Sequence, residues 1–239
     1  MTVTRLCDAT PPPGSTLAPP PPKYIGTCPK LVAGKNNIRS GLNNRSFLLA
    51  LPTGLDPSEK LPVIFLWHWL GGSADSFYTK GEVQAAVDGQ RFIAVIPEAK
   101  WDMIFKWPFD IAVAAARQEE EYRFFDDMLA CVAQQFNINK ECVATAGVSA
   151  GALFTDQLVG GRGKYLSSAL SLSGGTGAPG GLIKPFTPPD HRVPMLVLWG
   201  GAKDICIVIN FQTASKTLED QLVDRGHFFL ECQHNCGHG

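Results

Sequence analysis

The sequence predicts a single α/β domain built around a mostly parallel sheet, and three observations lead to this prediction. The chain has 239 residues, enough for one buried core and too few for two ordinary domains with a linker. Short apolar segments alternate with segments of helical periodicity, which is typical of a parallel sheet covered by helices. A serine between two glycines stands where an apolar segment passes into a helical one.

A proline-rich segment precedes the alternating pattern. Runs of consecutive prolines occupy residues 11–13 and 19–22. Such segments favour an extended polyproline conformation and bury little apolar surface. We therefore expect residues 1–35 to be an N-terminal tail or linker and residues 36–239 to form the folded domain.

The strands are predicted from short apolar segments. The longest apolar run, residues 63–70, has the length of a buried strand and falls far short of the roughly 20 residues of a transmembrane helix. The order of the segments argues for parallel strands joined by helices. The predicted strands are residues 47–51, 63–67, 92–96, 143–147, 169–173 and 195–199.

Helical segments and two loops fill the intervals. Residues 97–109 and 174–192 are rich in glycine, proline and aromatic residues, and predict loops over one end of the sheet. In an open α/β sheet that end is where ligands bind. Apolar or small residues at helical spacing predict helices on both faces, at residues 82–88, 119–136, 150–159 and 211–225.

The charge balance excludes several classes of partner. The chain has 21 Lys and Arg against 22 Asp and Glu, so its formal net charge is −1. A protein of this balance lacks the basic footprint that nucleic acids and anionic membranes require. We expect a monomer that binds neither nucleic acid nor membrane and acts on a neutral or weakly charged substrate.

The seven cysteines favour disulfides and therefore an oxidising, extracellular compartment. No basic region followed by an apolar core comes after Met1, so secretion is inferred from the cysteines alone. Cys232 and Cys236 lie close to His234 and His238, but the second pair of ligands that a zinc site needs is missing. We expect bridges Cys7–Cys28, Cys131–Cys142 and Cys206–Cys236, with one cysteine left over.

Gly147-Val-Ser-Ala-Gly151 has the sequence context of a nucleophile elbow. A small-residue strand precedes it and a helix-forming segment follows it. Glycines let strand and helix approach closely, and the sharp turn between them projects the serine hydroxyl outward. Ser149 is therefore the predicted nucleophile, and the N–H of Ala150 at the start of the helix is a predicted oxyanion donor.

The base and the acid should follow such a nucleophile in the order acid, then histidine. His238, between Gly237 and Gly239, is the first choice of base because it follows the last apolar segment and has a permissive backbone. Asp204 is the predicted acid because it follows a buried strand and a glycine turn. The alternatives are His234, then His191 and His227 at strand edges, and Asp190, Asp220 and Asp224 in a loop or on a polar helical face.

Five segments together resemble the polyhydroxybutyrate depolymerase and feruloyl esterase group of α/β-hydrolases, from about residue 36 to the end. They are His68-Trp-Leu-Gly-Gly-Ser73, Pro97-Glu-Ala99, Gly147-Val-Ser-Ala-Gly151, Gly200-Gly-Ala-Lys-Asp204 and Gly237-His238. The resemblance implies an α/β-hydrolase fold with a mostly parallel sheet and helices on both faces. It also implies a secreted serine carboxylesterase for hydroxycinnamoyl esters of plant polysaccharides or for polyesters.

The same resemblance assigns roles to individual residues. Ser149, Asp204 and His238 fall on the catalytic triad, and the N–H groups of Leu70 and Ala150 on the oxyanion hole. The chain departs from the family at Trp69, where glycine is common. With Trp101, Trp107, Phe105 and Phe109, this side chain is expected either to bind an aromatic acyl group or to serve only in packing.

The expected reaction needs neither a metal nor an organic cofactor, because the serine forms the acyl-enzyme and the histidine moves the protons. Two alternatives stay open. The same triad can hydrolyse peptides or transfer an acyl group to an alcohol, and the fold can serve as a non-catalytic binding module.

Overall fold

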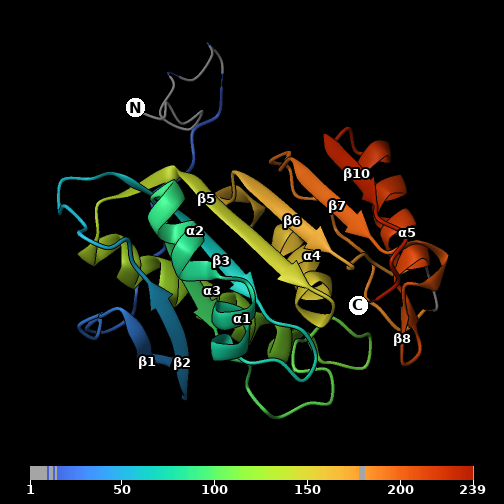
Figure 1. Ribbon diagram of the computed structural model, residues 1–239, viewed down its shortest axis with the longest axis horizontal. Coiled ribbons are helices and arrows are strands. Elements are labelled where there is room, and N and C mark those ends of the chain that lie inside the picture. Colours follow the sequence, from blue (N-terminus) through green and yellow to red (C-terminus); the bar gives the residue numbers. More distant parts are fainter. Residues whose placement is uncertain (1–9, 11–12, 14, 178–180, 239) are drawn as a thin grey trace.

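A twisted sheet of eight strands runs through the whole molecule (Figure 1). The structure, a computed structural model, describes residues 10, 13, 15–177 and 181–238. The strand order is β1-β2-β4-β3-β5-β6-β7-β10, and all pairs from β4 to β10 are parallel, whereas β1 and β2 pair antiparallel. The mostly parallel sheet that the sequence predicts is confirmed.

All six predicted strands are present. They are β2 (Asn43–Ala50), β3 (Leu61–Trp67), β4 (Ile93–Pro97), β5 (Ile138–Val148), β6 (Ser168–Leu172) and β7 (Met195–Trp199). The edge strands are β1 (Gly34–Ser40) and β10 (Phe229–Gln233). Strand β1 escaped prediction because its inward side chains include Asn36 and Ser40, so it lacks an apolar pattern. A separate hairpin pairs β8 (Ile205–Cys206) with β9 (Ile209–Asn210).

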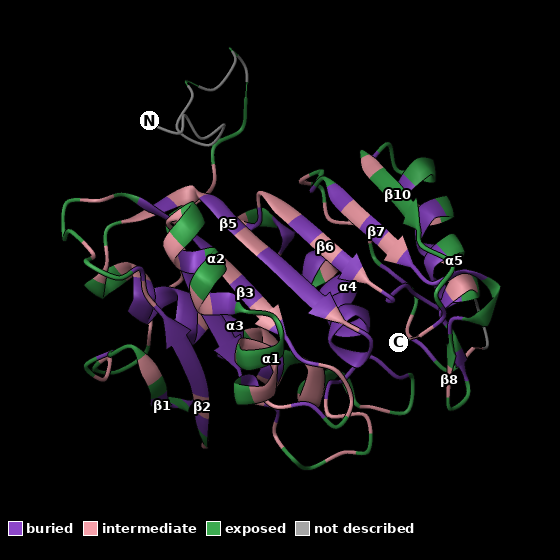
Figure 2. Cartoon of the chain, viewed as in Figure 1, coloured by how far each residue is buried: buried purple, intermediate pink, exposed green. Residues whose placement is uncertain are grey.

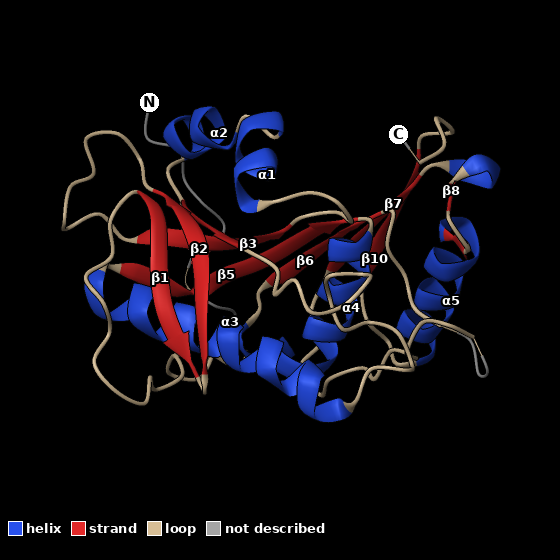
Figure 3. Cartoon of the chain, turned by 90° about the horizontal axis from the view of Figure 1, so that it is seen from below, coloured by secondary structure: helices blue, strands red, loops and turns tan. Residues whose placement is uncertain are grey.

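Helices lie on both faces of the sheet (Figure 3). Two short helices, α1 (Ala74–Lys80) and α2 (Val83–Gln90), cover β2 and β4 on one face. On the other lie α3 (Ala115–Gln135), α4 (Ala150–Arg162) and α5 (Phe211–Asp224). Short 3-10 turns span Gly163–Tyr165 and Gly201–Lys203. Helix α1 was not predicted, since its seven residues are too few to show a helical period.

Burial is uneven along the sheet (Figure 2). Every residue of β4 is buried, as are the first ten residues of α4. On β6 and β7 buried residues alternate with partly exposed ones, and most of β10 is exposed. The leucines 170, 172, 196 and 198 are in register on one partly exposed face of β6 and β7.

The two predicted loops lie together at the end of the sheet where the parallel strands terminate. A β-bridge joins Asp110, the residue after the first predicted loop, to Ile183 in the second. The N–H of Lys184 also donates to the carbonyl of Phe109. These bonds hold the loops to each other beside the ends of β5 and β6, where the serine elbow lies.

Part of the proline-rich segment lies against the domain. The N–H of Ala18 donates to the carboxylate of Glu141 at 2.7 Å, and Leu31 is buried in the core. A disulfide joins Cys28 to Cys131 across 103 residues. Strand β1 begins at Gly34, within the expected tail of residues 1–35, and residues 18–31 make specific contacts with the domain.

The expected disulfide pairing is wrong in the parts that the structure describes. Cys131 bonds to Cys28, because α3 lies beside the segment before β1, and Cys142 is in a different disulfide. Cys206 and Cys236 carry free thiols, so the expected bridge between the acid and base loops is absent there. The expected Cys7–Cys28 bridge is wrong as well, because Cys28 is bonded to Cys131; Cys7 itself lies outside the described residues. Within the described part of the chain no helix is long and apolar enough to cross a membrane.

Candidate active site

Ser149 lies at the sharp turn between β5 and α4. Its backbone has φ 56° and ψ −120°, a left-handed conformation that L residues seldom adopt. The turn is fixed on both sides, since its N–H donates to Leu172 and its carbonyl accepts from Leu153. A Cβ on Gly147 would overlap the Gly151 carbonyl, and one on Gly151 would overlap the carbonyl of Trp67. Both positions therefore require glycine, as the elbow motif predicts.

Three predicted site residues form one hydrogen-bonded chain. The Ser149 Oγ lies 2.9 Å from Nε2 of His238, and Nδ1 of His238 lies 2.6 Å from Oδ1 of Asp204. Asp204 is fully buried and His238 keeps 16% of its side chain exposed. With Nδ1 donating to the carboxylate, Nε2 is free to accept the serine proton. The arrangement is the one that the sequence predicts for a nucleophile, a base and an orienting acid.

His238 is the last described residue of the chain, and a small number of contacts hold it in place. The N–H of Gly237 donates to the carbonyl of Gly200, and the N–H of His234 donates to that of Trp199. The imidazole stacks on the ring of Phe211 with centroids 4.2 Å apart. These contacts attach the segment after β10 to the turn after β7, which places the base beside the acid.

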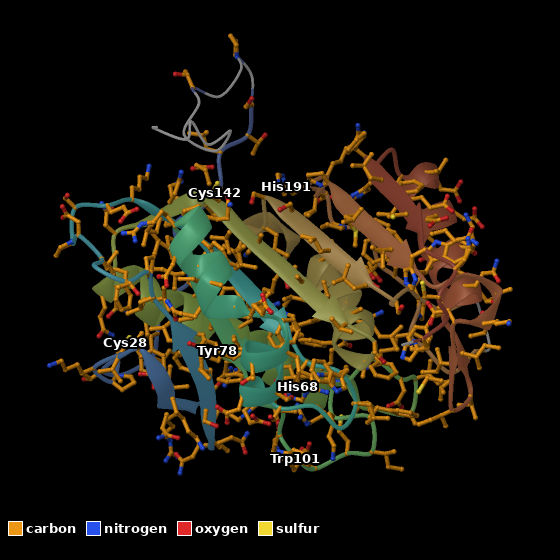
Figure 4. All side chains as sticks on the ribbon, viewed as in Figure 1. Cys28, His68, Tyr78, Trp101, Cys142 and His191 are labelled. Atoms are coloured by element: carbon orange, nitrogen blue, oxygen red, sulfur yellow. A yellow bond between two sulfur atoms is a disulfide. The ribbon has the colours of Figure 1, made fainter. Side chains whose placement is uncertain are left out.

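The alternative histidines lie elsewhere. His191 is at the opposite end of the sheet from His68 (Figure 4), where its Nε2 is 3.1 Å from the carbonyl of Leu166. His227 is buried, and burial lowers the pKa of its imidazole. His234 is exposed and accepts a hydrogen bond from the N–H of Cys236. The structure brings none of these three to the serine.

The loop after β3 brings Leu70 to the site. The Trp69 carbonyl accepts from the N–H of Gly72 at 2.9 Å and lies 2.9 Å from Nδ1 of His68. The carbonyl and N–H of a trans peptide unit point in opposite directions, so the N–H of Leu70 points away from these partners. Leu70 lines the pocket with Ser149 and Ala150. Ala150 begins α4, so its N–H has no acceptor within the helix.

His68 holds this loop as a neutral imidazole. Its Nδ1 donates to the Trp69 carbonyl, while Nε2 accepts from the N–H of Ala99 at 3.3 Å. Burial lowers the pKa of His68, although Glu98 at 3.7 Å opposes the shift. A proton on Nε2 would face the Ala99 N–H, so the neutral tautomer satisfies both bonds. The histidine of the first motif thus supports the loop and lies behind the pocket.

An apolar pocket opens above Ser149. The empty space in and above it, open solvent included, is about 260 Å³, and no charged side chain is among the described residues of its wall. Two aromatic residues come from the first loop and two isoleucines from the β8–β9 hairpin. Besides Ser149, Leu70 and Ala150, the wall consists of Phe105, Phe109, Leu153, Cys206, Ile207, Ile209 and Phe211.

The tryptophans expected to bind substrate lie outside this wall. Trp107 is fully buried, packs against Trp67 and Phe154, and donates from Nε1 to the His68 carbonyl at 2.8 Å. Trp101 is 62% exposed at the periphery (Figure 4) and lies under the ammonium group of Lys106. Trp69 packs on Phe77. Sequence reasoning placed Phe105 and Phe109 near the site but missed the hairpin, since its two-residue strands carry no periodic signal.

Comparisons with known proteins agree with this architecture. No protein-family profile matches the chain. A protein named "Probable feruloyl esterase C" of Aspergillus terreus is 26% identical over 159 residues, which are 65% of this chain and 55% of that protein. The match therefore spans about half the length of this curated relative.

Solved structures resemble the chain over most of its length. The native structure of the protein called pOPH superimposes with a TM-score of 0.74 at 14% identity, covering 89% of this chain and 83% of that one. A ferulic acid esterase of Anaeromyces mucronatus, solved with ferulic acid, gives a TM-score of 0.61 at 16% identity, covering 84% and 83%. Together with the strand order and the serine elbow, these likenesses show that the chain has the α/β-hydrolase fold.

Proposed function

We propose that the chain is a serine carboxylesterase with Ser149 as nucleophile, His238 as base and Asp204 as the acid that orients the base. The observation that carries this proposal is the hydrogen-bonded chain from Ser149 through His238 to Asp204, at the mouth of an apolar pocket. The Asp204 carboxylate is fully buried, so its charge acts on the His238 imidazole with little screening by water.

The reaction begins when Nε2 of His238 takes the proton of Ser149, whose Oγ bonds to the ester carbonyl carbon. The resulting oxyanion is stabilised by the N–H groups of Leu70 and Ala150. His238 then gives its proton to the departing alcohol oxygen as the carbon–oxygen bond breaks, which leaves an acyl-serine. Water loses a proton to His238, attacks the acyl carbon and releases the acid, while Ser149 regains its proton.

The pocket favours a neutral, apolar acyl group. Its wall places Phe105, Phe109 and Phe211 around Ser149, and it offers no charged side chain to pair with an ionic acyl group. Aromatic walls suit an aromatic acyl group, because ring faces and edges pack favourably. The names of the relatives, feruloyl and ferulic acid esterases, agree with a hydroxycinnamoyl ester. The same pocket also suits an aromatic or aliphatic polyester.

A disulfide supports an extracellular location for this esterase, since such bonds persist in oxidising compartments. We accordingly propose a secreted enzyme that acts as a monomer on neutral esters, outside any membrane and without a nucleic-acid partner.

Covalent labelling tests the proposal. A fluorophosphonate probe should modify Ser149, as located by peptide mass spectrometry, and His238→Ala should lose the label while keeping its circular dichroism spectrum. Hydrolysis of methyl ferulate and of p-nitrophenyl butyrate should then measure acyl preference. An intact wild-type protein that neither reacts with the probe nor cleaves any ester would overturn the proposal and favour a binding module.

A further inference from the structure

We infer that Ser173 is a positioning residue for the Asp204 carboxylate, an inference that rests on the proposed esterase function. Its hydroxyl donates to Oδ2 of Asp204 at 2.9 Å, on the oxygen that His238 does not use. None of the sequence motifs contains this serine.

The sheet order explains why Ser173 can reach the acid. Strand β6 lies between β5 and β7, and all three are parallel, so their C-terminal ends are neighbours (Figure 1). Ser149 follows β5, Ser173 follows β6 and Asp204 lies in the turn after β7. Ser173 is attached to both sides of this arrangement, because its N–H also donates to the carbonyl of Leu198 on β7.

Two donors fix the orientation of the buried carboxylate. The N–H of Gly200 donates to Oδ2 of Asp204 at 2.6 Å, and the Ser173 hydroxyl donates to the same oxygen. Their bonds leave Oδ1 directed at His238. A carboxylate turns readily about its last side-chain bond, since that torsion is broad. Loss of the hydroxyl therefore leaves one donor to hold the rotation that the base requires.

The backbone of Ser173 indicates that its side chain matters. Its φ is 50°, a left-handed conformation that glycine adopts without steric cost and serine does not. Gly174 and Gly175 follow directly, so the turn is built mostly of glycine apart from this position. If only the turn mattered at position 173, a third glycine would fit its backbone conformation better than serine does. The hydrogen bond from the Ser173 hydroxyl to Asp204 is the interaction that a glycine would lose.

The charges around His238 connect the inference to a measurable quantity, the pH dependence of the rate. Among the described residues, the His238 ring contacts Ser149, Asp204 and the ring of Phe211, and only Asp204 is charged. Lys203 precedes Asp204 but is exposed. The Ser173 hydroxyl turns the positive end of its dipole to the carboxylate, which weakens the negative field at His238. Removing the hydroxyl changes both this field and the orientation of the carboxylate, and should therefore displace the acidic limb of the rate profile.

The experiment compares Ser173→Ala and Ser173→Gly with the wild type, using kcat and KM for one ester from pH 5 to 9. Both variants should lose about tenfold in kcat with KM nearly unchanged, and the acidic limb of kcat/KM should be displaced from its wild-type position. Ser173→Gly should be at least as stable to heat as Ser173→Ala, because it relieves the left-handed backbone.

Ser171→Ala is the matched control. This buried serine on β6 also donates to a buried carboxyl group, but its partner is Asp156 at 2.9 Å, away from His238. It should lower the melting temperature and leave the pH profile in place. Wild-type kinetics in both Ser173 variants would overturn the inference while the proposed function stands. An inert wild-type protein would instead mean that the proposed function itself fails.

Discussion

The two ends of the hydrogen-bonded chain are built very differently. Ser149 sits between β5 and α4, in a turn that two glycines and the core determine. His238 follows an exposed segment, residues 230–236, and is held by a few bonds to the turn after β7 and by Phe211. Ser149 is thus fixed by the folding of the whole domain, whereas the position of His238 depends on local contacts that can open without global unfolding.

Removing either side chain should have the largest effect, and nearly the same effect, on catalysis. We expect Ser149→Ala and His238→Ala each to lower kcat by about 10⁵-fold or more, because the two groups act as a unit. Their stabilities should differ little from the wild type, as urea unfolding would show. An activity loss at His238 that is a thousandfold smaller than at Ser149 would show that the base is not in place.

Adding one methyl group to the elbow should break the fold. In Gly151→Ala the new Cβ would overlap the backbone carbonyl of Trp67, and neither strand nor helix can move without disturbing the core. We expect a loss of about 3 kcal/mol or more in the free energy of unfolding, or no soluble protein. A stable Gly151→Ala variant would contradict the view that the core fixes the nucleophile.

Asp156, buried in α4, should make the free energy of unfolding of the domain depend on pH. Burial raises the pKa of this carboxyl to about 8, from an ordinary value of 3.8. The folded chain then holds a proton that the unfolded chain releases, so stability is fully present below the ordinary value and is lost as pH rises toward 8. We expect unfolding free energies to fall by up to about 1.4 kcal/mol per pH unit between pH 5 and 8.

Asp156→Asn supplies the control for this slope. It replaces the titrating group by one of similar shape, so the unfolding free energy should become nearly independent of pH over the same range. An unchanged slope would assign the proton to another group, for which Asp126 is the first choice because burial raises its pKa to about 6.

The same methyl addition on the base side should have the smallest effect. In Gly200→Ala the Cβ would overlap the carbonyl of Gly237, but the exposed terminal segment can move away. We expect about a tenfold loss in kcat/KM, and the free energy of unfolding should fall by less than about 1 kcal/mol. A loss of stability as large as that of Gly151→Ala would remove the contrast between the two regions.

The sequence was most informative where local chemistry determines structure. The elbow needs glycines at positions 147 and 151, and the buried strands are apolar, so both are visible along the chain. The residues chosen for the nucleophile, acid and base meet in space as a result of these patterns. Strand β1 was missed because an edge strand can be polar.

Contacts between distant segments could not be predicted in the same way. The Cys28–Cys131 bridge spans 103 residues, and no spacing rule specifies such a pairing. Trp107 was assigned to the substrate because aromatic residues occur in both cores and sites, and only its burial decides between them. The bond from Ser173 to Asp204 likewise depends on the order of strands in the sheet.

The β8–β9 hairpin forms one wall of the pocket above Ser149 without belonging to the main sheet. Its outermost residues Ile207 and Val208 are 66% and 71% exposed, so replacing them removes little buried surface. If the proposed function holds, mutations of these two residues can change which esters fit while leaving the core and the elbow intact. The exposed tip of the hairpin is therefore where the substrate range can vary, whereas Ile209 at its base is buried in the core.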